Sequence, residues 1–230
     1  MQEWVSNRNA IISMNREQII TRTADHVKGL LDGEGTGHDW WHVQRVWKNA
    51  VAIGTEEQVD LFIVQLAALL HDIGDWKFHD GDESVGPKMA KKWLEGLGVN
   101  GATIAHVCEI ISGLSFKGAG TPTPMRTREG IVVQDADRLD ALGAIGIARA
   151  FAYGGSKGRE IHNPTVAPVQ HASFEEYKKS AGPTINHFYE KLLLLKDLMN
   201  TPTARRIAEE RHAFMEEYVR RFLDEWEGKA

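Results

Sequence analysis

The sequence predicts an all-α protein in which residues 1–230 form a single domain. Apolar residues recur at three- and four-residue spacing along nearly the whole chain, as amphipathic helices require. No segment of useful length alternates apolar and polar residues, and the triplet Ile131–Val133 lies inside a helical period. A chain of 230 residues with 42% hydrophobic residues is long and apolar enough for one sizeable core.

The first half of the chain predicts five helices. The first ends at Gly33, and the third ends at His71 and is apolar almost all round, so we expect it at the centre of the core. Thr55 with Gln58 three residues later is a capping-box signature for the start of that third helix, and Asn100 can cap the fifth. These helices are expected over about residues 19–31, 39–50, 55–71, 84–97 and 100–111.

The second half predicts further helices separated by two loops rich in glycine and proline, over 113–124 and 153–171. Between these loops we expect one continuous helix over residues 128–151. Ser173 with Glu176 is another capping box, and Gly182-Pro183 should break the helix that it opens. Thr201-Pro202 predicts the start of a last amphipathic helix over residues 204–226.

Composition narrows the class of protein. The net charge of −5 does not predict a broad surface for binding a nucleic-acid polymer, whereas a local basic cluster could still bind a small anion. The one cysteine, Cys108, cannot form an intramolecular disulfide, which fits a reducing compartment. Residues 1–15 lack the features of a signal peptide, and the longest apolar run, 66–70, is too short to cross a membrane. We therefore expect a cytoplasmic protein without membrane association.

The most informative chemistry is the pair His71-Asp72, which closes the apolar third helix. His42 lies upstream, and an acid-rich stretch lies downstream. Two imidazoles with carboxylates suit one divalent ion, with manganese expected first and magnesium, nickel, cobalt, zinc or iron as alternatives. Such an ion acidifies water and polarises phosphoryl oxygens, which predicts a metal-dependent hydrolase. The alternative is a structural hydrogen bond between His71 and Asp72 at a helix end.

Several neighbours are candidates for substrate or proton chemistry. Asp75 shares a helical face with His71 if that helix continues, so it is a candidate general base, or else a solvated carboxylate. His38 lies four residues before His42 and is a candidate substrate contact, or else a capping group. Arg45 lies on the face of His42 and suits a phosphate oxygen, although pairing with a carboxylate is commoner.

Three carboxylates, Asp135, Asp137 and Asp140, lie within six positions of an otherwise apolar segment. They are hard to explain as a solvated face, so one or two should meet a cation. Spacing alone does not choose among them. Arg138, in the same segment, and Lys77, just past Asp75, are candidates for neutralising phosphate charge.

Three ordered blocks resemble the HD-domain phosphohydrolase superfamily, most closely its small stand-alone bacterial members: HDWWHVQRV at 38–46, LHDIGDWK at 70–77 and QDADRLDALGA at 134–144. The resemblance spans about residues 38–151, with C-terminal helices over 173–228 packing on this core. It implies an all-helical bundle whose metal ligands are His42, His71, Asp72 and Asp137. It selects Asp137 over its acidic neighbours, and it makes Asp75 a catalytic acid or base.

The resemblance also implies hydrolysis of a phosphate ester or anhydride, with a small phosphorylated substrate such as a nucleotide. Lys77 and Arg45 are then expected in catalysis, and His38, Arg138 and Asp140 at the substrate. Two alternatives stay open: a non-catalytic sensor of metal or nucleotide, and a di-iron oxygenase. The oxygenase needs further histidine ligands, for which His106 is the one mid-chain candidate.

Overall fold

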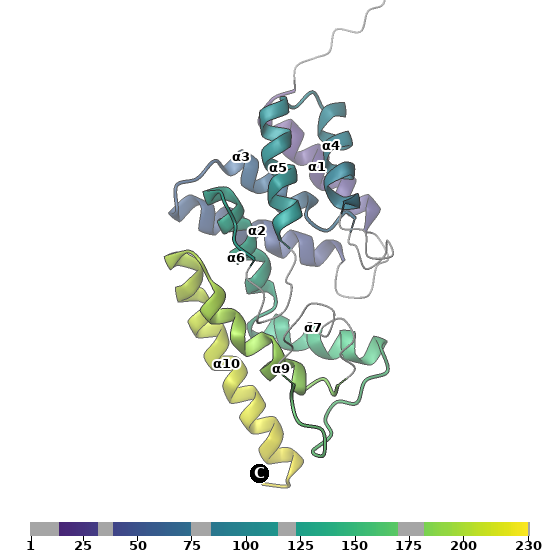
Figure 1. The fold of residues 1–230 in the computed structure, drawn as a ribbon, viewed down its shortest axis with the longest axis vertical. Coiled ribbons are helices and arrows are strands. Elements are labelled where there is room, and N and C mark those ends of the chain that lie inside the picture. The colour runs from purple at the N-terminus through teal and green to yellow at the C-terminus, as the bar shows by residue number, and fades with distance from the viewer. Residues whose placement is uncertain (1–13, 32–38, 75–83, 115–122, 170–181, 230) are drawn as a thin grey trace, which may run out of the picture.

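The structure is a computed structural model that describes residues 14–31, 39–74, 84–114, 123–169 and 182–229. Within these ranges every regular element is a helix, so the all-α prediction is confirmed (Figure 1). None of the helices described is both long and apolar enough to cross a membrane. The helix expected after Ser173 and parts of both predicted loops lie outside the described residues.

The helices are α1 (Arg16–Leu30), α2 (Trp40–Glu56), α3 (Leu61–Leu70), α4 (Val85–Gly96), α5 (Gly101–Gly113), α6 (Arg128–Asp140), α7 (Gly143–Ser156), α9 (Asn186–Glu190), the 3₁₀ helix η2 (Leu192–Leu198) and α10 (Pro202–Trp226). Polar side chains cap several of their first turns. Asn100 accepts from the backbone N–H of Thr103, and Thr201 accepts from that of Ala204. These caps satisfy N–H groups that have no partner inside the helix.

Helix α3 occupies the centre of the core, as its composition predicts. Its last five residues, Leu66–Leu70, are fully buried. The helix packs against α1, α2, α5 and α6. Burial on all sides fixes the direction in which the chain leaves α3, and the pair His71-Asp72 follows directly from that buried end.

Two predicted boundaries are wrong. Thr55 does not open a helix, because it lies in the last turn of α2 and its hydroxyl donates to the carbonyl of Val51. Asp60 caps α3 instead, and its carboxylate accepts from the backbone N–H of Phe62. The continuous helix expected over 128–151 is interrupted after Asp140, where Gly143 adopts a φ of +72°, a conformation that favours glycine.

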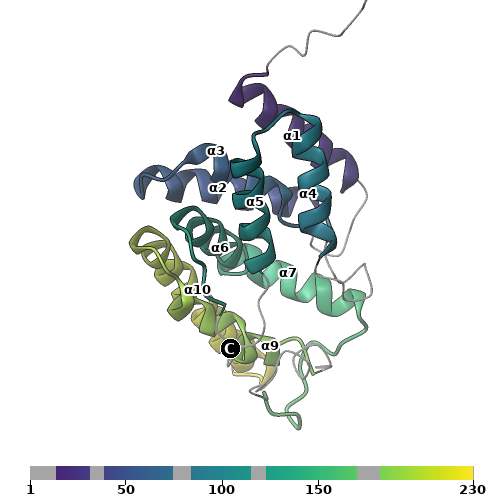
Figure 2. The ribbon, with the colours of Figure 1, turned by 45° about the horizontal axis from the view of Figure 1, so that its top comes forward.

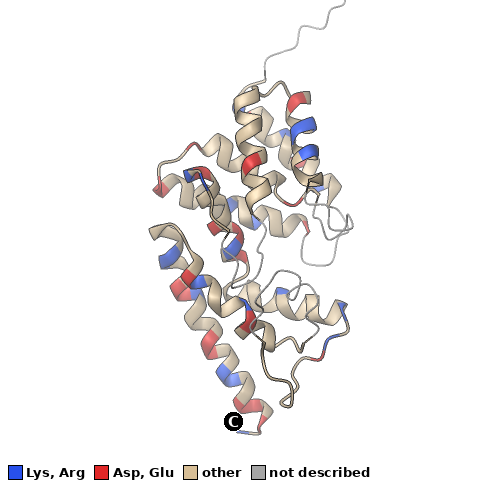
Figure 3. Ribbon diagram, viewed as in Figure 1, with Lys and Arg blue, Asp and Glu red and all other residues tan. Residues whose placement is uncertain are grey.

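Helix α6 connects the two ends of the molecule (Figures 1 and 2). Helices α1 to α5 gather at one end, and α7, α9 and α10 lie at the other. Helix α6 packs on α2 and α3 on one side and contacts α7 and α10 on the other. Along α10, basic and acidic residues are mixed (Figure 3), and Arg220 pairs with both Glu217 and Asp224.

Candidate metal centre

His42 lies in the first turn of α2, which Asp39 caps by accepting the backbone N–H of His42 at 2.8 Å. The cap fixes the start of the helix, and the imidazole then points inward against α6. The His42 side chain is 1% exposed. A polar ring that is buried this deeply needs partners for both nitrogens.

His71 and Asp72 lie in the turn that follows α3. This turn presses against the start of α4, since a Cβ atom at Gly74 would lie only 2.7 Å from the backbone nitrogen of Gly86. Glycine is therefore required at position 74. The contact holds the turn in place, with the side chain of His71 nearly buried and that of Asp72 mostly so.

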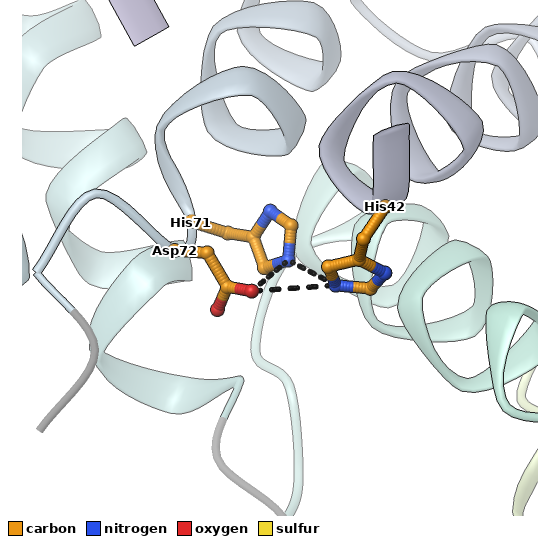
Figure 4. Close-up of side chains that lie close together, drawn as sticks. All are labelled: His42, His71 and Asp72. Atoms are coloured by element: carbon orange, nitrogen blue, oxygen red, sulfur yellow. Dashed lines mark hydrogen bonds and ion pairs between the residues drawn. The ribbon is translucent and has the colours of Figure 1, made fainter. Parts of the chain in front are cut away.

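Four side-chain atoms from three segments converge (Figure 4 shows three of the residues). The Nε2 atoms of His42 and His71 lie 3.3 Å apart. Asp72 Oδ2 lies 3.3 Å from the His42 nitrogen and 3.5 Å from the His71 nitrogen. Asp137 Oδ1, from α6, lies 3.5 Å and 3.9 Å from the same two atoms. Among the described residues, His42, His71 and Asp72 form the tightest candidate set of ligands.

The outer nitrogen of each ring is already engaged. Nδ1 of His71 lies 2.8 Å from the carbonyl oxygen of Ala68, which can only accept, so this nitrogen carries a hydrogen. Nδ1 of His42 lies 2.7 Å from Oδ2 of Asp140 and donates to it. In its neutral form, each ring therefore turns an Nε2 lone pair toward the centre, as in many metal sites in proteins.

These atoms fit a divalent ion. First-row ions bind nitrogen and carboxylate oxygen at about 2.0–2.2 Å, which places neighbouring ligand atoms about 3–3.5 Å apart. The separations among His42, His71 and Asp72 lie in or at the edge of that range. One proton can bridge only two of the four atoms, whereas one cation can satisfy all of them.

The pKa of His42 reflects the same surroundings. Burial acts to lower this pKa, but hydrogen bonds with Asp140 and Asp72 outweigh burial and raise it to about 9. Without a metal, the ring is therefore protonated at neutral pH and donates toward Asp72. A metal must displace that proton, because the Nε2 lone pair is its ligand.

The three acids of α6 have three different surroundings. Asp137 faces the two histidines, and its side chain is 34% exposed. Asp135 is fully buried and accepts hydrogen bonds from the backbone and side chains of Asn200 and Thr201, which anchors the start of α10. Of these two acids, Asp137 is therefore the one near the two histidines, whereas Asp135 anchors one helix to another.

Asp140 lies beneath His42 and is 2% exposed. Arg45 donates from Nε and Nη2 to its two oxygens at 2.7 and 3.0 Å, and Arg149 donates to Oδ2 at 3.0 Å. Burial acts to raise the pKa of Asp140, but hydrogen bonds from His42 and Arg45, together with the charge of Arg149, hold it well below its usual range. Asp140 is therefore a buried carboxylate that orients His42.

This placement changes the roles predicted for three residues. Asp140 has too little exposed surface for the substrate contact that was expected of it. Arg45 makes the pairing with a carboxylate that the sequence left as its alternative. Arg138 donates to the carbonyl of Leu198 and to the hydroxyl of Thr123, which favours a structural role over substrate binding. In each case, packing between helices supplies a partner that local sequence does not reveal.

Three predicted site residues, His38, Asp75 and Lys77, lie outside the described residues. His106 is described, and its Nε2 lies 3.7 Å from Glu129, a residue at the opposite end of α6 from Asp137.

The sequence did not indicate a role at the site for Arg149, or for Arg211, whose Nη1 donates to the carbonyl of Leu139. Neither arginine has a local signal, since both act through contacts distant in sequence.

Comparison with known proteins identifies the family of the chain. A model of the HD domain matches residues 40–142, a range that includes all four converging residues. Over 197 residues the chain is 44% identical to YpgQ of Bacillus subtilis, which covers 84% of this chain and 87% of YpgQ. The chain belongs to the HD-domain superfamily. The pair His71-Asp72 lies within the range that the HD-domain model matches.

Several solved structures superpose on most of the chain. A Lactobacillus plantarum protein is 37% identical with a TM-score of 0.83, covering 94% of this chain and all of its own. An HD-superfamily hydrolase from Bacillus thuringiensis is 44% identical with a TM-score of 0.73, covering 93% and 99%. B. subtilis YpgQ, solved in complex with ADP, is 38% identical with a TM-score of 0.73, covering 92% and 96%. The chain therefore has the fold of an HD-superfamily hydrolase.

Proposed function

We propose that this HD protein is a metal-dependent phosphohydrolase that cleaves phosphate ester or anhydride bonds of a nucleotide. The observation that carries the proposal is the convergence of two Nε2 atoms and two carboxylate oxygens from α2, the turn after α3, and α6. A hydrolase among the relatives supports the reaction class, and the complex of YpgQ with ADP supports a nucleotide.

His42, His71, Asp72 and Asp137 would hold one divalent ion. The mixed set of nitrogen and oxygen ligands suits manganese first, with magnesium, nickel, cobalt, zinc or iron also compatible. When bound, the ion supplies a Lewis acid that polarises a phosphoryl oxygen and acidifies water. Of the four ligands, Asp137 is the most exposed, so we expect substrate to approach from its side.

The remaining residues would position the ligands and the substrate. Asp140 keeps the Nδ1 proton of His42 directed away from the centre, which preserves the Nε2 lone pair for binding. Asp75 would orient or deprotonate the attacking water, as its place in the HD motif implies. Lys77, two residues further along the chain, would neutralise phosphate charge. His38, four residues before His42, is retained as a substrate contact.

A panel of nucleoside mono-, di- and triphosphates, incubated with the protein and each divalent ion in turn, tests this function. We expect at least one nucleotide to be hydrolysed, with release of either phosphate or pyrophosphate identifying the bond that is cleaved. The matched control is Asp72→Ala, which lacks one ligand. Binding of nucleotide without turnover under every metal would contradict the hydrolase and favour a sensor, whereas two irons per chain would favour an oxygenase.

A further inference from the structure

The last turn of α6 carries both Asp137 and Asp140, and two arginines from later helices hold its end. Arg149, on α7, donates from Nη1 to the Asp140 carboxylate at 3.0 Å and to the Asp140 backbone carbonyl at 3.2 Å. Arg211, on α10, donates from Nη1 to the backbone carbonyl of Leu139 at 2.6 Å. Two guanidinium groups thus meet one helix end next to the metal centre.

These contacts add donors at the end of α6. Helix α6 ends at Asp140, and the carbonyl of Leu139 accepts from the backbone N–H of Leu142 at 3.1 Å, so Arg211 supplies a second donor to it. Gly143 turns the chain away with a positive φ, and the stem of Arg211 packs where a side chain would otherwise be. A Cβ atom at Gly143 would lie 3.1 Å from Cγ and 3.2 Å from Cβ of Arg211. The arginine therefore fits against the helix end with its stem as well as with its charge.

We propose that Arg149 and Arg211 are positioning residues of the metal centre, and that they clamp the end of α6 so that Asp137 and Asp140 keep their places. Both arginines lie beyond residues 40–142, the part matched by the HD-domain model. Helices α7 and α10 then help to hold the metal ligands in place. This inference rests on the metal site that the proposed function requires.

The two arginines act by different routes. Arg149 contacts Asp140 directly, and Asp140 in turn fixes the ring of His42. Arg211 donates to the backbone carbonyl of Leu139, which lies between the two acids in sequence, so it acts on both through the position of the helix turn. Loss of Arg149 should consequently disturb metal binding more than loss of Arg211.

Calorimetric titration of Mn²⁺ into metal-free protein tests the clamp without relying on turnover. Arg149→Ala should weaken Mn²⁺ binding by roughly 10- to 100-fold, the usual range for loss of a residue that supports a ligand, and Arg211→Ala by about tenfold. Arg149→Lys keeps the charge and one donor, so it should recover most of the affinity. Thermal unfolding with and without Mn²⁺ should show correspondingly smaller stabilisation by the metal in both alanine variants.

Two controls separate positioning from general stability. Arg206→Ala removes the same charge from α10 at an exposed pair with Glu56 and should leave Mn²⁺ affinity unchanged. Met215→Ala creates a cavity at a fully buried position of α10, so it should lower the unfolding temperature while retaining the affinity.

The clamp is overturned if folded Arg149→Ala and Arg211→Ala both bind Mn²⁺ as tightly as wild type does. If Arg149→Ala does not fold, wild-type affinity in Arg211→Ala alone overturns it. It is also overturned if Met215→Ala weakens binding as much as either alanine variant does. A wild-type protein that binds no divalent ion would overturn the proposed function together with the clamp. Metal binding by wild type with unchanged affinity in the variants would remove the clamp alone.

Discussion

Asp140→Asn removes one negative charge from beneath His42 while changing the side-chain volume very little. In the structure, Oδ2 of Asp140 accepts from His42, Arg45 and Arg149, and Oδ1 accepts from Arg45 alone. The amide oxygen of asparagine should therefore take the place of Oδ2, where three donors meet. Its NH₂ group then faces Nε of Arg45, a donor opposite a donor.

The cost follows from these contacts. Loss of one hydrogen bond to a charged group costs about 1.5–3 kcal/mol, and the bonds that remain are weakened because the acceptor is neutral. We therefore expect the free energy of unfolding of the metal-free protein to fall by about 2–4 kcal/mol. The ring of His42 is held less firmly, so affinity for Mn²⁺ should fall by roughly 10- to 100-fold, or about 1.4–2.7 kcal/mol.

Calorimetric titration of Mn²⁺, paired with urea unfolding of the metal-free protein, measures both quantities. Asp135→Asn is the matched control, because it removes an equally buried carboxylate of the same helix that contacts Asn200 and Thr201 instead. It should lower stability with metal affinity kept within about twofold, because the bonds of Asp135 go to Asn200 and Thr201 and not to a ligand of the metal. The orienting role of Asp140 is refuted if folded Asp140→Asn binds Mn²⁺ as tightly as wild type, or if both variants lose affinity equally.

Three further predictions concern the same centre. Asp72→Ala should abolish Mn²⁺ binding with helix content unchanged by circular dichroism, because α3 is intact; retained stoichiometric metal would contradict this. The pKa of His42 is raised from 6.5 to about 9, so its contribution to the stability of the metal-free protein is full below pH 6.5 and lost as pH rises through 9. Over that window Mn²⁺ affinity should rise, by about tenfold per pH unit for release of one proton, and calorimetry in buffers of different ionisation enthalpy should detect that proton; a flat profile would count against it. Asp75→Asn should bind metal normally but turn over roughly 10²–10⁴-fold more slowly, and wild-type turnover would return Asp75 to an ordinary carboxylate.

The helices were largely predictable because their signals are local. Asn100 and Thr201 cap helices as their positions indicate, and the apolar run before His71 is the buried helix that its composition requires. The prediction at Thr55 was wrong because a threonine hydroxyl can either cap the start of a helix or donate to the carbonyl four residues earlier inside one. The position of the helix end shows that Thr55 does the second. That the whole chain forms one domain stays a prediction.

The residues of the candidate site that belong to a sequence motif could be predicted. The contacts that arise from packing between helices could not. His42, His71 and Asp72 converge as expected. The partnership of His42 with Asp140 joins residues 98 positions apart, and it depends on α2 packing against α6. Arg149 reaches that carboxylate only because Gly143 redirects the chain after α6. No sequence pattern within a single helix predicts these contacts between helices.

The most direct test of the account is turnover of a nucleotide by protein stripped of metal and then titrated with Mn²⁺. Activity should be absent in the stripped protein. It should rise in proportion to added Mn²⁺ up to one equivalent per chain, when the site formed by the four converging side chains is fully occupied. Asp72→Ala should stay inactive throughout the titration. Full activity that persists in excess chelator after dialysis would contradict the central claim.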